Sequence, residues 1–215
     1  VAAVQEGRTI YDNIRKFVAF LLTCNLAEIM VIFIGTLLGY PNILTPIQLL
    51  WLNLLTDGAP ALALGVEKGD PDIMDRPPRP TNEPIVNRVL TINIVVQTIF
   101  KTGVTLAAFF IGLQQGGIEE AHSMAFTVLA FSELTRAYSA RSEYFSMFKI
   151  GLFSNKWMQY AVAASGALLL MVVYVPFFNP IFETVPMPWL DWVEMLPLIL
   201  LPTIAGEITK LFLKK

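Results

Sequence analysis

The stretch "LLWLNLLTDGAP", residues 49–60, puts three polar side chains into a long apolar run and then interrupts the run with glycine and proline. Asn53, Thr56 and Asp57 follow an i, i+3, i+4 spacing, which places them on one face of a helix. An ionised aspartate at the centre of a bilayer-spanning helix costs about 2.5–3.5 kcal/mol on insertion scales. A sequence that accepts this cost is expected to use the residue.

The composition predicts a multi-span membrane protein. Of the 215 residues, 55% are hydrophobic and 15% charged, with a mean hydropathy of +0.60 and a net charge of −2; these values do not suit a soluble domain. The single cysteine, Cys24, excludes an intrachain disulfide and is expected to be a packed thiol. The polar, helix-like start "VAAVQEGRTIYDNIRKF" has no signal-peptide pattern and is typical of an internal piece of a longer chain.

A bilayer-spanning helix needs roughly 20 apolar residues. We therefore expect an all-α, polytopic membrane bundle: residues 1–16 begin a cytoplasmic stalk, and residues 17–215 form a six-helix transmembrane domain. The fourth span has the weakest hydrophobic signal because it carries Glu133 and Arg136. The predicted spans are 17–39, 47–65, 89–113, 123–140, 157–178 and 190–212.

The positive charges predict the orientation. Lys101 and Arg136 lie within spans, and none of the 15 lysines and arginines lies in the loops near 40–46, 114–122 and 178–189. By the positive-inside rule both termini and the two basic loops, 66–88 and 141–156, are cytoplasmic. The remaining positive residues are Arg8, Arg15, Lys16, Lys68, Arg76, Arg79, Arg88, Arg141, Lys149, Lys156, Lys210, Lys214 and Lys215.

Polar residues inside the spans are the candidate site. Such side chains normally face a partner, an ion path or a water-filled cavity, although hydrogen bonds between helices are the simpler alternative for the amides and the threonine. Three unpaired carboxylates would cost on the order of 8–10 kcal/mol on the same insertion scale. Either some of these acids are protonated or a cation compensates them. The candidate ligands are Asn25, Glu28, Asn53, Thr56, Asp57 and Glu133.

The candidate ligands all offer oxygen atoms, which favours a hard cation over copper or zinc. Their side chains supply nine oxygens. Calcium takes about 6–8 oxygens, so nine satisfy one calcium ion, and a second ion needs backbone carbonyls, waters or shared ligands. The same oxygens would also accept sodium. Gly58 and Pro60 weaken the helix next to this group, and the break is either a simple kink or an opening of the backbone toward an ion.

"LLWLNLLTDGAPALALG", followed by "DPDIMDRPPRPTNEPIV", resembles the P-type calcium-transporting ATPases of the sarcoplasmic-reticulum and secretory-pathway kinds and their prokaryotic relatives. "EGRTIYDNIRKF" and "CNLAEI" resemble the stalk and the fifth membrane helix of that family. The resemblance covers the whole chain as the fifth to tenth membrane helices, although the last two helices carry few diagnostic residues.

The resemblance implies roles for individual residues. It implies that the 66–88 loop touches the phosphorylation domain, that phosphorylation of an aspartate there drives alternating access, and that protons return on the vacated carboxylates. It implies no catalytic or cofactor-binding residue in this chain. The implied calcium ligands are Asn25 and Glu28 of the fifth helix, Asn53, Thr56 and Asp57 of the sixth, and Glu133 of the eighth.

Arg136 departs from the family pattern. It lies three residues after Glu133, on the same helix face, where the vertebrate pumps have a neutral polar residue. Its guanidinium either pairs with Glu133 and weakens the nearest ion site, favouring one calcium per cycle, or extends to the cytoplasmic boundary. We carry Arg136 as a possible modulator of the site.

The family's Asp-Lys-Thr-Gly-Thr and Pro-Glu-Gly-Leu-Pro motifs are absent from these residues, so the chain alone is expected not to hydrolyse ATP. The resemblance implies Mg²⁺ and ATP for the full-length pump only. It implies as partners the lipid bilayer, the cytoplasmic phosphorylation, nucleotide-binding and actuator domains, and the first four membrane helices, and it implies no nucleic acid. The location would be the cell membrane in a prokaryote and an internal organelle membrane otherwise.

Three rival interpretations remain open. A P-type pump for sodium or another hard cation would use the same oxygens. A secondary transporter or channel with a carboxylate site at the membrane midplane often has an internal repeat, which is not apparent here. A membrane assembly module without transport would keep its ion flux after Asp57→Asn.

Overall fold

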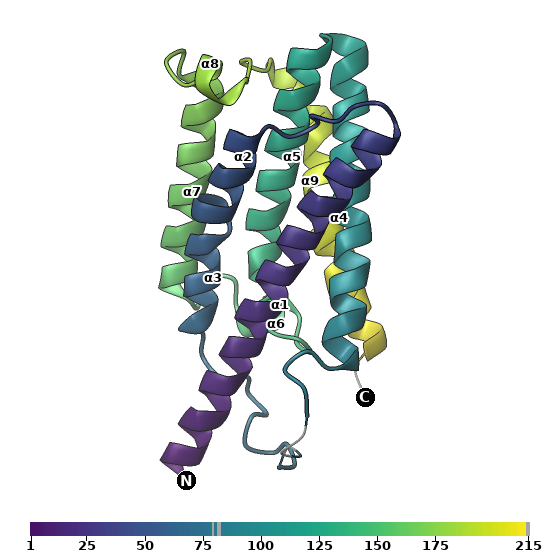
Figure 1. Cartoon of the computed structure of the whole chain (residues 1–215). Helices are drawn as coiled ribbons and strands as arrows, with labels where there is room; N and C mark the ends of the chain where they lie inside the picture. Colours follow the sequence, from purple (N-terminus) through teal and green to yellow (C-terminus); the bar gives the residue numbers. More distant parts are fainter. Residues whose placement is uncertain (79, 81–82, 214–215) are drawn as a thin grey trace.

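The computed structural model describes residues 1–78, 80 and 83–213. Within this part of the chain the secondary structure is helical and contains no strand, which confirms the all-α prediction. Three members of the positive-charge pattern, Arg79, Lys214 and Lys215, lie outside the described residues. The long helices run side by side as a bundle (Figure 1).

A helical element lies within each of the six stretches that the hydropathy pattern predicts as spans, although α7 ends at Tyr174, inside the predicted stretch 157–178. The first is longer than predicted because the stalk and the span form one continuous helix of 36 residues. The second is divided by a turn of π-helix, η1. In chain order the elements are α1 (Ala2–Leu37), α2 (Pro46–Trp51), η1 (Leu52–Thr56), α3 (Gly58–Gly65), α4 (Arg88–Gln115), α5 (Ile118–Ser139), α6 (Met147–Ile150), α7 (Lys156–Tyr174), α8 (Asn179–Phe182) and α9 (Trp189–Leu213).

Among the residues that the structure describes, five helical units are long and apolar enough to cross a membrane. The predicted fourth span, α5, is not among them. Helix α5 packs against α4, α7, α9 and α3, and most of its side chains are buried. A helix enclosed by other helices has little surface facing lipid, so it tolerates polar residues that a peripheral helix would not. The five units are Ala2–Leu37, Pro46–Gly65, Arg88–Gln115, Lys156–Tyr174 and Trp189–Phe212.

A close helix contact holds α5 against α4. At Gly112 of α4 a Cβ atom would lie 2.8 Å from the Cα of Ala121 in α5, so only glycine permits this approach. The turn between the helices uses Gly117 with a φ of 82°, a conformation that glycine adopts without steric cost. Buried Phe109 and Phe126 fill the interface. The α4–α5 hairpin therefore forms the centre of the bundle.

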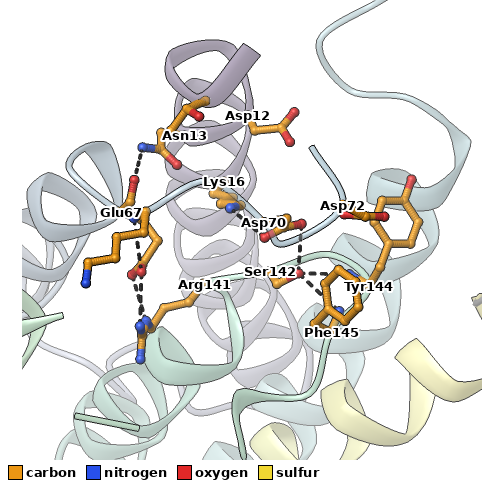
Figure 2. A network of polar contacts seen from close by, with 12 residues as sticks. Asp12, Asn13, Lys16, Glu67, Asp70, Asp72, Arg141, Ser142, Tyr144 and Phe145 are labelled. Carbon is orange, nitrogen blue, oxygen red and sulfur yellow. Dashed lines mark hydrogen bonds and ion pairs between the residues drawn. The ribbon is translucent and has the colours of Figure 1, made fainter. Parts of the chain in front are cut away.

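The chain termini and the two basic loops gather at one end of the bundle, and the loops 38–45 and 175–188 lie at the other (Figure 1). At the first end the 66–88 loop is tied to α1 by buried charges. Lys16 Nζ lies 3.3 Å from Asp70 Oδ1, and Arg76 lies 2.7 Å from the other oxygen of Asp70 and 3.0 Å from Asp12. Ser142 Oγ donates to Asp70 at 3.0 Å (Figure 2).

A second buried ion pair ties the two basic loops to each other. Arg141 donates from Nε and Nη2 to the two carboxylate oxygens of Glu67, at 2.7 and 3.0 Å (Figure 2). Glu67 also accepts from Asn155 at 2.8 Å, and its backbone carbonyl accepts from Asn13 of α1 at 2.7 Å. Both charges of the pair are buried, so each depends on the other for compensation.

Arg141→Ala is expected to lower the free energy of unfolding of the intact protein by about 3–5 kcal/mol, because it leaves the Glu67 carboxylate buried without its partner. Thermal unfolding in detergent measures this loss. The control, Lys156→Ala, removes an exposed lysine at the start of α7 and should change stability by less than about 0.5 kcal/mol. Equal losses in the two variants would contradict the role of the pair.

Asp70→Asn tests the pairing of the 66–88 loop with α1 as a function of pH. Burial raises the pKa of Asp70, but Lys16, Arg76 and Ser142 outweigh it and hold this pKa below its ordinary value of 3.8. A carboxylate whose pKa is lower in the folded than in the unfolded state stabilises the fold at pH values above its unfolded-state pKa. This stabilisation is lost as the pH falls through the folded-state pKa. The stability difference between wild type and variant should be constant from pH 7 to about pH 5 and shrink below about pH 4. A difference that changes between pH 7 and 5 would refute this assignment.

Candidate cation site

Helix α1 carries polar side chains in the middle of its apolar length. Cys24 and Glu28 are buried, whereas Asn25 is exposed and its amide donates to the Leu21 carbonyl at 2.8 Å. Residues three or four positions apart share a helix face, so Glu28 lies one turn beyond Cys24 and Asn25. Of the two ligands predicted from this helix, Glu28 is the one that the structure buries inside the bundle.

The second predicted span is interrupted at the polar stretch. In η1 the backbone N–H of Asp57 donates to the Leu52 carbonyl, five residues earlier, at 2.9 Å. Pro60 has no N–H to donate to the Thr56 carbonyl, and its ring crowds that carbonyl. The break is thus a widened turn immediately before Asp57, a geometry that is frequent at functional sites.

A neighbouring helix supports the widened turn. Ser165 of α7 donates from its hydroxyl to the Leu55 carbonyl at 3.0 Å. Backbone carbonyls at membrane depth need such partners because lipid supplies none. The hydrogen bond therefore holds the irregular backbone of η1 in a defined position relative to α7.

Asp57 is fully buried, and neither of its carboxylate oxygens has a hydrogen-bond partner among the described residues. The same is true of Thr56 Oγ1 and Glu28 Oε1. Buried polar atoms in folded proteins are nearly always paired, and an unpaired one costs about 1–3 kcal/mol, more when it is charged. These oxygens are therefore suited to a positively charged ligand.

Three separate helical segments bring their polar groups together. The amide of Asn53, which is itself exposed, donates to Glu28 Oε2 at 2.8 Å and so links η1 to α1. Glu133 of α5 is fully buried. The Cys24 sulfur, an Asp57 oxygen and a Glu133 oxygen all lie within 4.8 Å of one another. Asp57 and Glu133 thus lie together, Glu28 is joined to η1 through Asn53, and carboxylate oxygens suit a hard cation.

Lys101 of α4 supplies positive charge to this cluster. Its Nζ lies 3.4 Å from Glu133 Oε1 and 3.1 Å from Cys24 Sγ, and it faces the Phe20 ring at 5.9 Å. Lys101 and Glu133 are both fully buried. Two unit charges at about this separation attract by about 4 kcal/mol at an effective dielectric constant near 20. Sequence reasoning assigned Lys101 no partner, although an intramembrane charge is itself a signal that one exists.

Arg136 is not paired with Glu133. Its Nη2 donates to Asn93 Oδ1 of α4 at 3.3 Å, and Glu133 pairs with Lys101 instead. The ion pair that the i, i+3 spacing suggested therefore does not form, because α4 packs against α5 and reaches the carboxylate from another helix. Arg136 remains buried, with 5% of its surface exposed.

The match to a protein family gives independent information about this chain. Residues 41–212 match the family described as cation transporting ATPase, C-terminus. The chain belongs to this family. The matched region includes η1, Asp57 and Glu133, but it begins after Glu28 in the chain.

Individual relatives extend the similarity over α1. Calcium-transporting ATPase 1 of Yarrowia lipolytica is 37% identical over 215 residues, which is 100% of this chain and 23% of that protein. The calcium-transporting ATPase of Bacillus subtilis is 38% identical over 211 residues, 96% of the chain and 24% of the relative. Human calcium-transporting ATPase type 2C member 1 is 37% identical over 211 residues, 98% of the chain and 23% of the relative. This cation-transporting ATPase chain thus spans about a quarter of the length of these relatives.

The Lys101–Glu133 pair predicts a non-additive effect on stability. Lys101→Met and Glu133→Gln, made singly in the full-length protein, should each lower the free energy of unfolding by about 3–5 kcal/mol, because each leaves one buried charge uncompensated. The double variant should recover most of this loss, since it removes both charges. Thermal unfolding of all four proteins measures the coupling, and a double variant as unstable as the sum of the two singles would contradict the ion pair.

Proposed function

We propose that this chain is the cation-binding membrane part of an ATP-driven calcium pump. The observation that carries the proposal is Asp57, a fully buried carboxylate with both oxygens unpaired among the described residues, set directly after a π-turn. An oxygen-rich, negatively charged cluster favours a hard divalent cation. The relatives' own names, calcium-transporting ATPases, support calcium as the transported ion.

In this proposal the ligands of the transported ion come from α1, η1, the residue that follows η1, and α5. Glu28 and Asp57 supply negative charge, Thr56 supplies a hydroxyl oxygen, and Asn25 and Asn53 supply amide oxygens. Glu133 adds a third carboxylate from α5. Asn25 and Asn53 are exposed, as are the apolar neighbours Leu50 and Leu54, which supports additional membrane helices of the same pump as the cover of this face.

The proposed topology has six spans with both termini in the cytoplasm. It counts α5 as a span that protein rather than lipid surrounds. The positive-inside rule and the gathering of the termini and basic loops at one end of the bundle (Figure 1) support this orientation. ATP, Mg²⁺ and the phosphorylated aspartate belong to domains outside these residues, so hydrolysis requires the rest of the pump.

Helix α1 connects the two ends of the proposed mechanism. Its 36 residues form one helix about 54 Å long, and Asp12 and Glu28 are separated along it by about 24 Å. The ion pairs Lys16–Asp70 and Arg76–Asp12 fasten the 66–88 loop to the stalk. A displacement of the stalk by the cytoplasmic domains would therefore move Glu28 relative to Asp57 and change the coordination of the ion.

Release of the ion leaves carboxylates buried in the bundle. Buried carboxylates without a compensating charge take up protons, because burial disfavours the charged form. We therefore include proton return on the vacated Glu28 and Asp57 in the proposed cycle. The counter-transported protons would offset part of the charge that the calcium ion carries outward.

Asp57→Asn tests the function. In the full-length pump this isosteric change should weaken the calcium dependence of phosphorylation by ATP by more than about 100-fold, because it removes a charged ligand rather than an outer partner. Asp75→Asn, in the exposed part of the 66–88 loop, is the matched control and should leave the dependence unchanged. Phosphorylation by inorganic phosphate without calcium checks that each variant is folded.

Two results would contradict the proposal. Unchanged calcium dependence in Asp57→Asn would separate this residue from the ion. A cation series in which sodium and not calcium stimulates phosphorylation of the wild type would reassign the pump to a monovalent ion.

A further inference from the structure

Two carboxyl groups meet at the end of the bundle that carries the 175–188 loop, opposite the termini (Figure 1). Glu120 lies in the first turn of α5 and Asp191 in the first turn of α9, and their side chains are in hydrogen-bonding contact. The Glu120 carboxylate lies against the backbone of Gly116, in space that a Cβ atom on Gly116 would occupy. The pair therefore joins two helices that are far apart in the chain.

Asp191 keeps one oxygen that the described residues leave free. The residue is 5% exposed, and its Oδ2 has no hydrogen-bond partner among them. The contact with Glu120 thus engages one side of a buried carboxyl group and leaves the other side without a donor. Buried polar atoms are nearly always paired, so this oxygen points to a ligand that the described chain does not supply.

The charges around the pair are negative. Residues 102–135 and 157–209 include one buried cluster acid and the acids of this end, but no lysine or arginine. Glu194 adds a further negative charge that acts on Asp191, and Gln115 of α4 donates to Glu194 Oε2 at 2.7 Å. The carboxyl groups therefore lie in a region whose own segments offer no basic side chain to compensate them.

Two carboxyl groups in contact are not both ionised without compensation. The dipoles of α5 and α9 favour an acid in each first turn, but they place no donor on Asp191 Oδ2. One proton shared between Glu120 and Asp191 compensates one charge and leaves that oxygen unpaired. A hard divalent cation compensates both carboxylates and engages the free oxygen, and water completes its coordination at the half-buried Glu120.

We propose that Glu120 and Asp191 form a calcium-binding site at the end of the bundle opposite the termini. The ion bridges α5 and α9 and holds the start of α9 on the α4–α5 hairpin. Two carboxylates and water make a weak site, for which a dissociation constant of about 10⁻⁴–10⁻³ M is typical of extracellular modules. The site is separate from the cluster around Asp57, and the inference does not depend on the proposed function.

Hydrogen exchange of the purified full-length protein in detergent tests the site, because it reports on each segment separately. A ligand slows exchange through local opening by the factor 1 + [L]/Kd. Calcium at about ten times the expected dissociation constant, at constant ionic strength, should therefore slow the backbone amides of 114–122 and 186–195 about tenfold.

Glu120→Gln/Asp191→Asn removes the proposed ligands and should abolish this slowing. The matched control, Glu119→Gln/Glu183→Gln, removes the same charge from two exposed acids at the same end and should stay within about twofold of wild type, since both variants change surface electrostatics alike. Unchanged exchange in the 66–88 loop shows that a variant is folded. If the double variant is misfolded, Glu120→Gln alone decides, because its amide can still donate to Asp191.

Three outcomes would overturn the inference. No slowing in the wild type, or equal slowing by sodium at the same ionic strength, would reduce the effect to screening. Equal slowing in the Glu120/Asp191 variant would place the ion elsewhere. Slowing on acidification but not with calcium would make the pair a contact that shares a proton.

Discussion

Three carboxylates buried within the same group of helices are the constraint on which the rest of this structure depends. Glu28, Asp57 and Glu133 come from three segments and lie where neither water nor lipid can solvate their charge. One of them receives an internal partner, Lys101. All three still have at least one oxygen with no hydrogen-bond partner among the residues described. These unpaired oxygens are what gives the cluster the properties of a binding site.

The backbone around Asp57 is arranged to serve the same cluster. A regular α-helix would engage the backbone around Asn53 and Thr56 in its own hydrogen bonds, but the π-turn and Pro60 interrupt this ladder just before Asp57. Ser165 of α7 then fixes the position of the Leu55 carbonyl. The irregular turn is therefore held in place by a neighbouring helix. Glu28 lies on α1, the same continuous helix that forms the stalk and contacts the 66–88 loop.

Much of the architecture could be predicted from the sequence, because hydrophobic length and polar spacing are local properties. A helical element lies within each stretch predicted as a span, and an Asp57 oxygen and a Glu133 oxygen lie within 4.8 Å of each other. The weak hydropathy of α5 has a tertiary cause, since the helix is enclosed by α4, α7 and α9. Spacing within one helix left Arg136 either as a partner of Glu133 or as a side chain extending to the cytoplasmic boundary, whereas the ion-pair partner of Glu133 is Lys101 of a different helix.

Residue order alone is enough to predict that the chain forms apolar helices, which faces of those helices are polar, and where the second helical stretch is interrupted. These features follow from residue order, because side chains three or four positions apart must share a helix face and proline must interrupt the ladder. Which charges form pairs depends on how the helices pack. Lys101 reaches Glu133 of α5 and Cys24 of α1 because α4 packs against both helices, and contacts between helices depend on packing that no spacing along one helix encodes.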